Sequence, residues 1–204
     1  VGQISLDCLN TRDFAMRPRL WLKLLSETRG TTSCSPPFGY DLAARRVRDD
    51  ELAGYDLRSW RVAGVGAEMI RPETLARFAD RLAPSGFSSR AFLPCYGMAE
   101  CSLAVCFAPL DHGVRIDRVD AERLADRQLA EAVPPRGRNG DLRANSFVTC
   151  GQPLPDCDVE IRDEQQQVLP ERRCGTLYVR GPSLMTGYFN NAEATGEVLS
   201  PEGW

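Results

Sequence analysis

Stretches of helical periodicity alternate with short apolar stretches along the first half of this chain. Apolar residues recur every three or four positions after Pro18 and again over residues 72–82, which is typical of amphipathic helices. Short runs at residues 31–35, 59–63 and 91–95 are typical of strands. Because helical connections of about 10 to 20 residues join these strands, we expect the strands to pair in parallel. The sequence therefore predicts an α/β fold containing part of a parallel, Rossmann-like sheet flanked by helices.

Further helices are expected over residues 40–48 and 98–107, with a weaker candidate over residues 121–132. From residue 147 the pattern changes to short β runs separated by Pro and Gly. Such runs are typical of a small antiparallel β subdomain.

We therefore expect two subdomains. Residues 1–146 would form the α/β part, with a long and irregular insertion over about residues 101–146. Residues 147–204 would form the small β subdomain. Where the insertion packs against the rest of the protein, we expect its apolar side chains to make the contacts: Val114, Ile116, Val119 and Leu124.

Two residue counts restrict the chemistry that this chain can support. It contains one histidine, His112, and one lysine, Lys23. A metal site with two histidines is excluded, and a Ser-His-Asp triad would have to use His112. Lys23 lies in a helical stretch, where a solvent-exposed charge is the simplest interpretation.

The charge and cysteine patterns exclude several partners. The formal net charge of −3 provides no positive field for nucleic acid. There is no run of 18 apolar residues, so we expect no transmembrane segment. The eight cysteines include no CxxC motif and lie mostly in apolar runs, which favours reduced thiols and a cytoplasmic protein.

Two short motifs directly follow predicted strands: Gly64-Val65-Gly66-Ala67-Glu68 and Tyr96-Gly97-Met98-Ala99-Glu100. In parallel sheets, ligands bind outside the carboxyl ends of the strands. A glycine loop lets the backbone approach a flat or phosphorylated ligand, a tyrosine can stack on a base, and Glu100 can bind Mg²⁺. Taken singly, the first motif favours a tight strand-to-helix turn, and the second is equally compatible with a helix-start carboxylate beside a core tyrosine.

Several strings in a fixed order carry a resemblance to a known family. They are VGAE, YGMAE, FVTCGQPLPDCDVEI, GTLYVRGPSLMTGYFNNAEAT and a final PEGW. Together they resemble the adenylate-forming superfamily of acyl-CoA synthetases and adenylation domains. SPPFGYDLAARR, RVAGVGAEMIRPETLARFADRLAPSGF and AFLPCYGMAECSLAV look most like its fatty acyl-AMP ligase branch. The resemblance extends over about residues 17–204.

The resemblance implies a ligase that uses ATP and Mg²⁺ to convert a fatty acid into an acyl adenylate and pyrophosphate. By position, Glu100 would be catalytic and would hold Mg²⁺. Phe38 and Tyr40 would lie near the acyl chain. The implied nucleotide-binding residues are Gly66, Ala67, Glu68, Tyr96, Gly97, Met98 and Ala99. Most relatives have Thr at the position of Ala99, so no side-chain hydroxyl is available to the phosphate there.

The resemblance also implies that this chain is an internal fragment. The phosphate loop would precede Val1, while a ribose-binding Asp and a mobile domain with a catalytic lysine would follow Trp204. Because phosphoryl chemistry depends on positioning and on cationic stabilisation, we expect the chain alone to be inactive.

Three alternatives for the acceptor and the function remain open. The fatty acyl-AMP ligase branch passes its acyl group to an acyl carrier protein, and the long segment 101–146 is typical of that branch. An acyl-CoA synthetase would use CoA instead. A non-catalytic nucleotide-binding or scaffold module is the alternative from another class.

Overall fold

The computed structural model describes residues 4–134 and 143–204, and the chain divides into two compact units. Unit 1 comprises Val1–Pro94 and Ala108–Arg115, and unit 2 comprises Cys95–Phe107 and Ile116–Trp204. This division differs from the boundary expected near residue 146. The physical reason is sheet pairing, because residues 106–107 pair with residues 152–153 and so join segments from both sides of that boundary.

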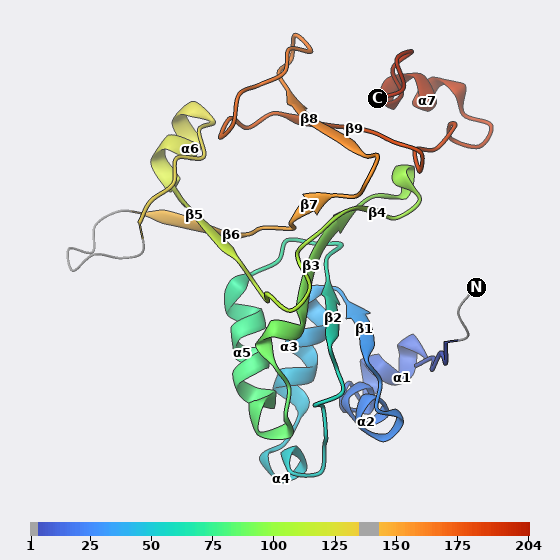
Figure 1. Ribbon diagram of the computed structural model, residues 1–204, viewed down its shortest axis with the longest axis vertical. Helices are drawn as coiled ribbons and strands as arrows, with labels where there is room; N and C mark the ends of the chain where they lie inside the picture. Colours follow the sequence, from blue (N-terminus) through green and yellow to red (C-terminus); the bar gives the residue numbers. More distant parts are fainter. Residues whose placement is uncertain (1–3, 135–142) are drawn as a thin grey trace. The chain divides into compact units, whose positions relative to one another are not determined.

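Unit 1 holds the parallel strands and most of the helices. Its elements are α1 (Thr11–Met16), α2 (Arg19–Thr28), β1 (Thr32–Ser35), α3 (Pro37–Arg46), α4 (Asp49–Leu52), β2 (Val62–Val65), α5 (Pro72–Leu82), the 3₁₀ turns η1 (Ala83–Ser85) and η2 (Ser89–Ala91), and the first half of β3 (Phe92–Gly97). β1 pairs with β2 and β2 with β3, both in parallel. Figure 1 shows α3 and α5 side by side along these strands. The predicted parallel sheet with flanking helices is confirmed.

Local sequence signals explain where the helices of unit 1 begin and end. Pro18 precedes α2, and Arg29 ends it in the left-handed conformation, with φ 53°. Pro72 occupies the first turn of α5, where its fixed φ suits a helix start. The same property of Pro37 starts α3 three residues before the predicted position. β2 begins later than predicted because the backbone N–H of Trp60 closes a turn on the Leu57 carbonyl.

The core of unit 1 is a cluster of interlocking aromatic rings. Trp60, Tyr40, Phe78 and Phe92 are at most 2% exposed. Phe78 lies at the centre, with its ring centroid 5.0 Å from those of Tyr40 and Phe87. Most of these pairs meet edge to face, which aromatic quadrupoles favour. The α5 periodicity therefore places Phe78 where α3 and the sheet converge.

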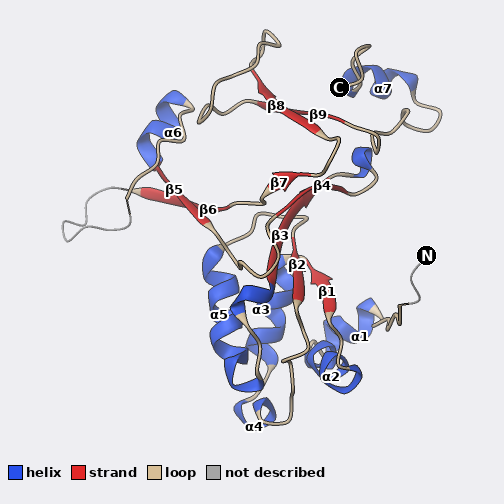
Figure 2. Cartoon of the chain, viewed as in Figure 1, coloured by secondary structure: helices blue, strands red, loops and turns tan. Residues whose placement is uncertain are grey.

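Unit 2 is built from antiparallel strand pairs, coloured red in Figure 2. Its elements are the second half of β3, η3 (Ala99–Cys101), β4 (Ala104–Phe107), β5 (Ile116–Asp120), α6 (Ala121–Arg127), β6 (Ala144–Val148), β7 (Gln152–Pro153), β8 (Asp158–Arg162), β9 (Thr176–Arg180) and α7 (Ala192–Val198). The pairs are β3–β4, β4–β7, β5–β6 and β8–β9. The predicted antiparallel β part is confirmed.

The helix predicted over residues 98–107 is wrong. A short 3₁₀ turn ends at Cys101, Ser102 takes a positive φ of 63°, and the chain then returns as β4 beside β3. Short apolar runs do not distinguish a helix from a strand by periodicity. Here the pairing with β3 decides, and it buries Val105 against Cys101 and Val179.

The segment 101–146 is more regular than expected. It contains β4, β5, α6 and the start of β6, while residues 135–142 lie outside the described residues. α6 is shorter than predicted because Gln128 ends it with φ 50°. Of the apolar residues expected to pack, Val119 is buried and Ile116 is half exposed.

Within the described ranges 4–134 and 143–204, no helix combines the length and the apolar character that crossing a bilayer demands. The eight cysteines, all within the described ranges, form no disulfide bond.

Candidate functional site

The first predicted motif begins inside a strand and not in a loop. Gly64 belongs to β2, where it pairs with Cys34 of β1. A Cβ on Gly64 would lie 2.6 Å from the Cys34 sulfur. The absence of a side chain at Gly64 thus serves packing between neighbouring strands, and the loop proper starts at Gly66.

The loop after β2 contacts the N-terminus of α3 and caps it through Glu68. Ala67 adopts the left-handed region, with φ 68°, which is uncommon for a residue with a Cβ. The Glu68 carboxylate accepts a hydrogen bond of 2.9 Å from the backbone N–H of Phe38, in the first turn of α3. That bond satisfies one of the free N–H groups of α3 and places a negative charge at its positive end. Glu68 therefore has a structural role, whatever ligand its loop binds.

The two residues predicted near an acyl chain differ in their surroundings. Phe38 is 56% exposed. Tyr40 is fully buried, and its hydroxyl donates a 2.9 Å hydrogen bond to the Gly64 carbonyl. The structure thus ties Tyr40 to the aromatic core and to β2. Phe38 is the member of this pair whose ring is accessible.

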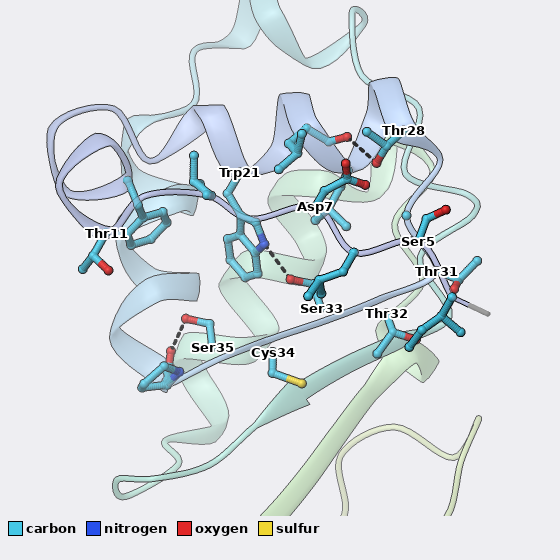
Figure 3. Close-up of a pocket in the computed structure, with 18 of the residues that line it drawn as sticks. Ser5, Asp7, Thr11, Trp21, Thr28, Thr31, Thr32, Ser33, Cys34 and Ser35 are labelled. Carbon is cyan, nitrogen blue, oxygen red and sulfur yellow. Dashed lines mark hydrogen bonds between the residues drawn. The ribbon is translucent and has the colours of Figure 1, made fainter. Parts of the chain in front are cut away.

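Phe38 lines a pocket of about 510 Å³ in unit 1, shown in Figure 3. The walls come from the segment before α1, from α2 and from β1. Apolar side chains such as Trp21 alternate there with hydroxyl groups, and the Trp21 indole N–H donates a 2.8 Å hydrogen bond to Ser33. An apolar wall with a few oriented polar groups is typical of small-molecule sites. Sequence reasoning missed this pocket because periodicity does not show how the segment before α1, α2 and β1 fold against one another.

The second motif lies at the end of β3, in unit 2. The register of the β3–β4 pair shifts between Tyr96 and Gly97. A Cβ at Gly97 would lie only 1.7 Å from the Leu103 carbonyl oxygen, so this turn accepts no side chain. The Tyr96 ring is 42% exposed, which leaves it available for stacking. Strand pairing therefore explains the glycine and leaves the tyrosine free for a ligand.

After Gly97 the backbone is extended at Met98. The 3₁₀ turn η3 then begins with Ala99 and Glu100. Met98 packs against the small apolar core of unit 2, whereas Ala99 is exposed. Glu100 is only partly buried, and its carboxylate accepts a hydrogen bond of 2.5 Å from the Tyr188 hydroxyl. The hydrogen bond from Tyr188 lowers the pKa of Glu100, and the backbone N–H of Glu100 lowers it further. Glu100 is thus held as a carboxylate.

Tyr188 is a residue that sequence reasoning missed. It lies 88 positions from Glu100 in the chain. The only signal was the aromatic-rich string GYFNN, which by itself is typical of a structural loop. The same hydrogen bond raises the pKa of Tyr188. Pairing of the two side chains depends on the fold of unit 2 and could not be found from spacing.

The donor groups fit a magnesium–nucleotide complex better than a metal bound by protein alone. Among residues 4–134 and 143–204, no group of three or more His, Cys, Asp or Glu could hold a metal ion. Mg²⁺ is usually bound by one or two carboxylates together with phosphates and water. A carboxylate has about four lone-pair sites, so Glu100 can accept from Tyr188 and still bind a cation.

Similarity to known proteins is extensive. A family model described as AMP-binding enzyme matches residues 7–189. A protein of Caulobacter vibrioides (strain NA1000 / CB15N) named "Putative acyl-CoA synthetase" is 45% identical over 202 residues, which cover 99% of this chain and 35% of that protein. The medium-chain-fatty-acid–acyl-carrier-protein ligase TtuA of Teredinibacter turnerae is 31% identical over 188 residues, covering 92% of this chain and 28% of that protein.

A solved structure from studies of fatty acyl-adenylate ligases of E. coli and L. pneumophila has a TM-score of 0.87 and 44% identity to this chain. The match covers 95% of this chain and 34% of that one. The chain spans about a third of the length of the curated relatives that it matches.

Proposed function

The chain belongs to the AMP-binding enzyme family, and from this premise we propose that the complete protein is a fatty acid–AMP ligase. It would use ATP and Mg²⁺ to join the carboxylate of a fatty acid to AMP, with release of pyrophosphate. The chain by itself would be inactive, because it spans about a third of its relatives' length. Acid-dependent ATP–pyrophosphate exchange by the isolated chain, above a boiled control, would contradict that part of the proposal.

The observation that carries the proposal is the environment of Glu100. Its carboxylate lies at the turn after a sheet strand, accessible to solvent and fixed by the Tyr188 hydroxyl. Bound Mg²⁺ would neutralise phosphate charge beside Glu100. An ionised and oriented carboxylate is the group that such a cation needs from the protein.

The other residues have supporting roles in the proposal. Tyr96, with its exposed ring, would stack on the adenine. The backbone around Gly97 would approach the nucleotide closely, since no side chain fits there. Nucleotide contacts are also proposed for the remaining motif positions: Gly66, Ala67, Glu68, Met98 and Ala99.

Phe38 would contact the acyl chain, because its exposed ring lines a pocket with apolar walls. Tyr40 would act indirectly, by holding α3 against β2 through its bond to the Gly64 carbonyl. The fatty-acid specificity is further supported by the similarity to a medium-chain fatty acid ligase and to fatty acyl-adenylate ligases.

For the acceptor we propose an acyl carrier protein. The support is the long segment 101–146 and the similarity to a ligase named for an acyl carrier protein. CoA is the second candidate, favoured by the similarity to a 45% identical protein named as an acyl-CoA synthetase. Purified complete protein, given labelled fatty acid and either acceptor, separates the two. Acyl transfer to CoA at a rate equal to or above that to carrier protein would overturn the first choice.

The central test is Glu100→Gln in the complete protein. We expect kcat/KM for acid-dependent pyrophosphate release to fall about 10²-fold or more, since a metal-binding carboxylate stabilises developing charge. Glu197→Gln, an exposed carboxylate on α7, is the matched control and should leave the rate unchanged. A loss of less than about threefold for Glu100→Gln would mean that Glu100 has a structural role alone.

A further inference from the structure

A loop from the far end of unit 2 is fastened to the turn that carries Glu100. The backbone N–H of Met185 donates a 2.7 Å hydrogen bond to the Glu100 carbonyl. The Ser102 hydroxyl donates to the Ser183 carbonyl at 3.1 Å. Tyr188 adds the third bond, from its hydroxyl to the Glu100 carboxylate. Two of these bonds fix backbone, and the third reaches the functional group itself.

Apolar contact anchors the same loop. Leu184 packs against the buried cluster of Cys101, Val105 and Val179. The turn and the loop thus share one small core, so apolar packing adds to the hydrogen bonds that hold the loop.

Tyr188 is also held from its other side. Its backbone N–H donates to the Thr195 hydroxyl at 2.9 Å, and that hydroxyl donates to the Asn191 carbonyl at 2.7 Å. Asn191 in turn caps α7 through the N–H of Ala194. Gly187 has φ 151° and lies against Thr195, a position that a side chain would strain. The backbone that carries the Tyr188 ring is therefore held in place by the start of α7.

We propose that Tyr188 is a positioning residue for Glu100, orienting its carboxylate toward the metal–nucleotide complex. The inference rests on the proposed function, which assigns Glu100 to the metal. Tyr188 is 37% exposed, so a bond between it and Glu100 adds little to folding stability. Its effect is instead to remove rotational freedom from a side chain that must meet a cation at one place. Partners of metal-binding groups act in this way, and their loss costs about 10- to 100-fold in metal affinity or activity.

The test is Tyr188→Phe in the complete protein, which removes one hydroxyl and keeps the ring. The measurement is the affinity for Mn²⁺, which a purely structural role of Tyr188 would not change. Mn²⁺ serves as a paramagnetic probe and is titrated in the presence of a non-hydrolysable ATP analogue, with electron paramagnetic resonance as the readout. We expect the Mn²⁺ dissociation constant to rise about tenfold and the half-saturating Mg²⁺ concentration for pyrophosphate release to rise with it. The melting temperature should stay unchanged.

Phe189→Leu is the matched control, because the neighbouring Phe189 ring is 93% exposed. A double-mutant cycle completes the design: in the Glu100→Gln background, Tyr188→Phe should have no further effect on Mn²⁺ binding. If Glu100→Gln leaves metal affinity and activity intact, the proposed function fails. If Glu100→Gln abolishes metal binding while Tyr188→Phe binds Mn²⁺ like the unaltered protein, the positioning role fails and the proposed function stands.

Discussion

Unit 1 and unit 2 are stabilised in different ways. Unit 1 encloses a cluster of aromatic rings whose centroids lie between 5.0 and 6.4 Å apart. In the described part of unit 2, the buried apolar side chains are small: Cys101, Val105, Val119 and Val179. Unit 2 relies instead on strand ladders and on charged groups at its surface.

The end of unit 2 illustrates this second way. The guanidinium carbons of Arg162 and Arg180 each lie 4.5 Å from the centroid of the Trp204 ring. Each arginine also pairs with a carboxylate of β8, Arg162 with Glu160 and Arg180 with Asp158. Cation–π pairs at partly exposed sites contribute about 0.5–1 kcal/mol each, far less than a buried aromatic ring.

The two units also differ in how far their motif side chains are available to a ligand. In unit 1, motif residues such as Tyr40 and Glu68 are committed to packing or capping. In unit 2, Tyr96 and Glu100 are accessible to solvent. The pairing of β3 with β4 positions Tyr96, and the Tyr188 hydroxyl orients Glu100. Because the core of unit 2 consists of small side chains, its motif side chains remain accessible, and hydrogen bonds rather than packing fix their orientation.

The strongest test of the contrast is Phe78→Ala in unit 1. Removing this central ring should lower the free energy of unfolding by about 3–5 kcal/mol, because a large cavity forms among rings that cannot collapse into it. Chemical denaturation followed by fluorescence of Trp21 and Trp60, which lie beside Phe78, measures the loss. Phe189→Ala, at an exposed ring of unit 2, should change stability by less than about 0.5 kcal/mol. Equal losses for the two variants would break the comparison.

A glycine pair sharpens the comparison within unit 2. Gly97→Ala forces a Cβ into the Leu103 carbonyl and should cost about 1–3 kcal/mol as β3 and β4 separate. Gly196→Ala, in α7, meets nothing within 4 Å and should stabilise its helix by up to about 1 kcal/mol. Hydrogen–deuterium exchange in residues 104–107 is the measurement. Unchanged protection there in Gly97→Ala would show that the turn adapts without strain.

The smallest expected effect concerns thiol chemistry. Partial burial raises the pKa of the Cys150 thiol to about 11. Alkylation requires the thiolate, so labelling of Cys150 by iodoacetamide should keep rising about tenfold per unit between pH 8 and pH 10. Peptide mass spectrometry reports the rate, and the exposed Cys34 of unit 1 provides the reference for fast labelling. A plateau for Cys150 below pH 9.5 would contradict the expected burial.

Periodicity was a sound guide in unit 1. Three of its helices, α2, α3 and α5, carry apolar stripes with Pro at or just before their starts, and both signals act within a few residues of the chain. It failed at residues 98–107, because a short apolar run suits a helix or a strand until a neighbour is present. In the same way, spacing marked Glu100 as a candidate and gave no sign of Tyr188, since their bond joins positions 88 residues apart.

The sequence by itself determined the α/β class, the parallel order of β1 to β3, the antiparallel character of the later strands and the family resemblance. All four properties depend on local periodicity, on turn residues and on motif strings, which can be identified from residues that are close together in the sequence. The tertiary structure alone decided that residues 104–107 form a strand, that Glu68 caps α3 and that Tyr188 orients Glu100. Each of these depends on a partner distant in sequence, and such contacts exist only once the backbone has closed the loops between them.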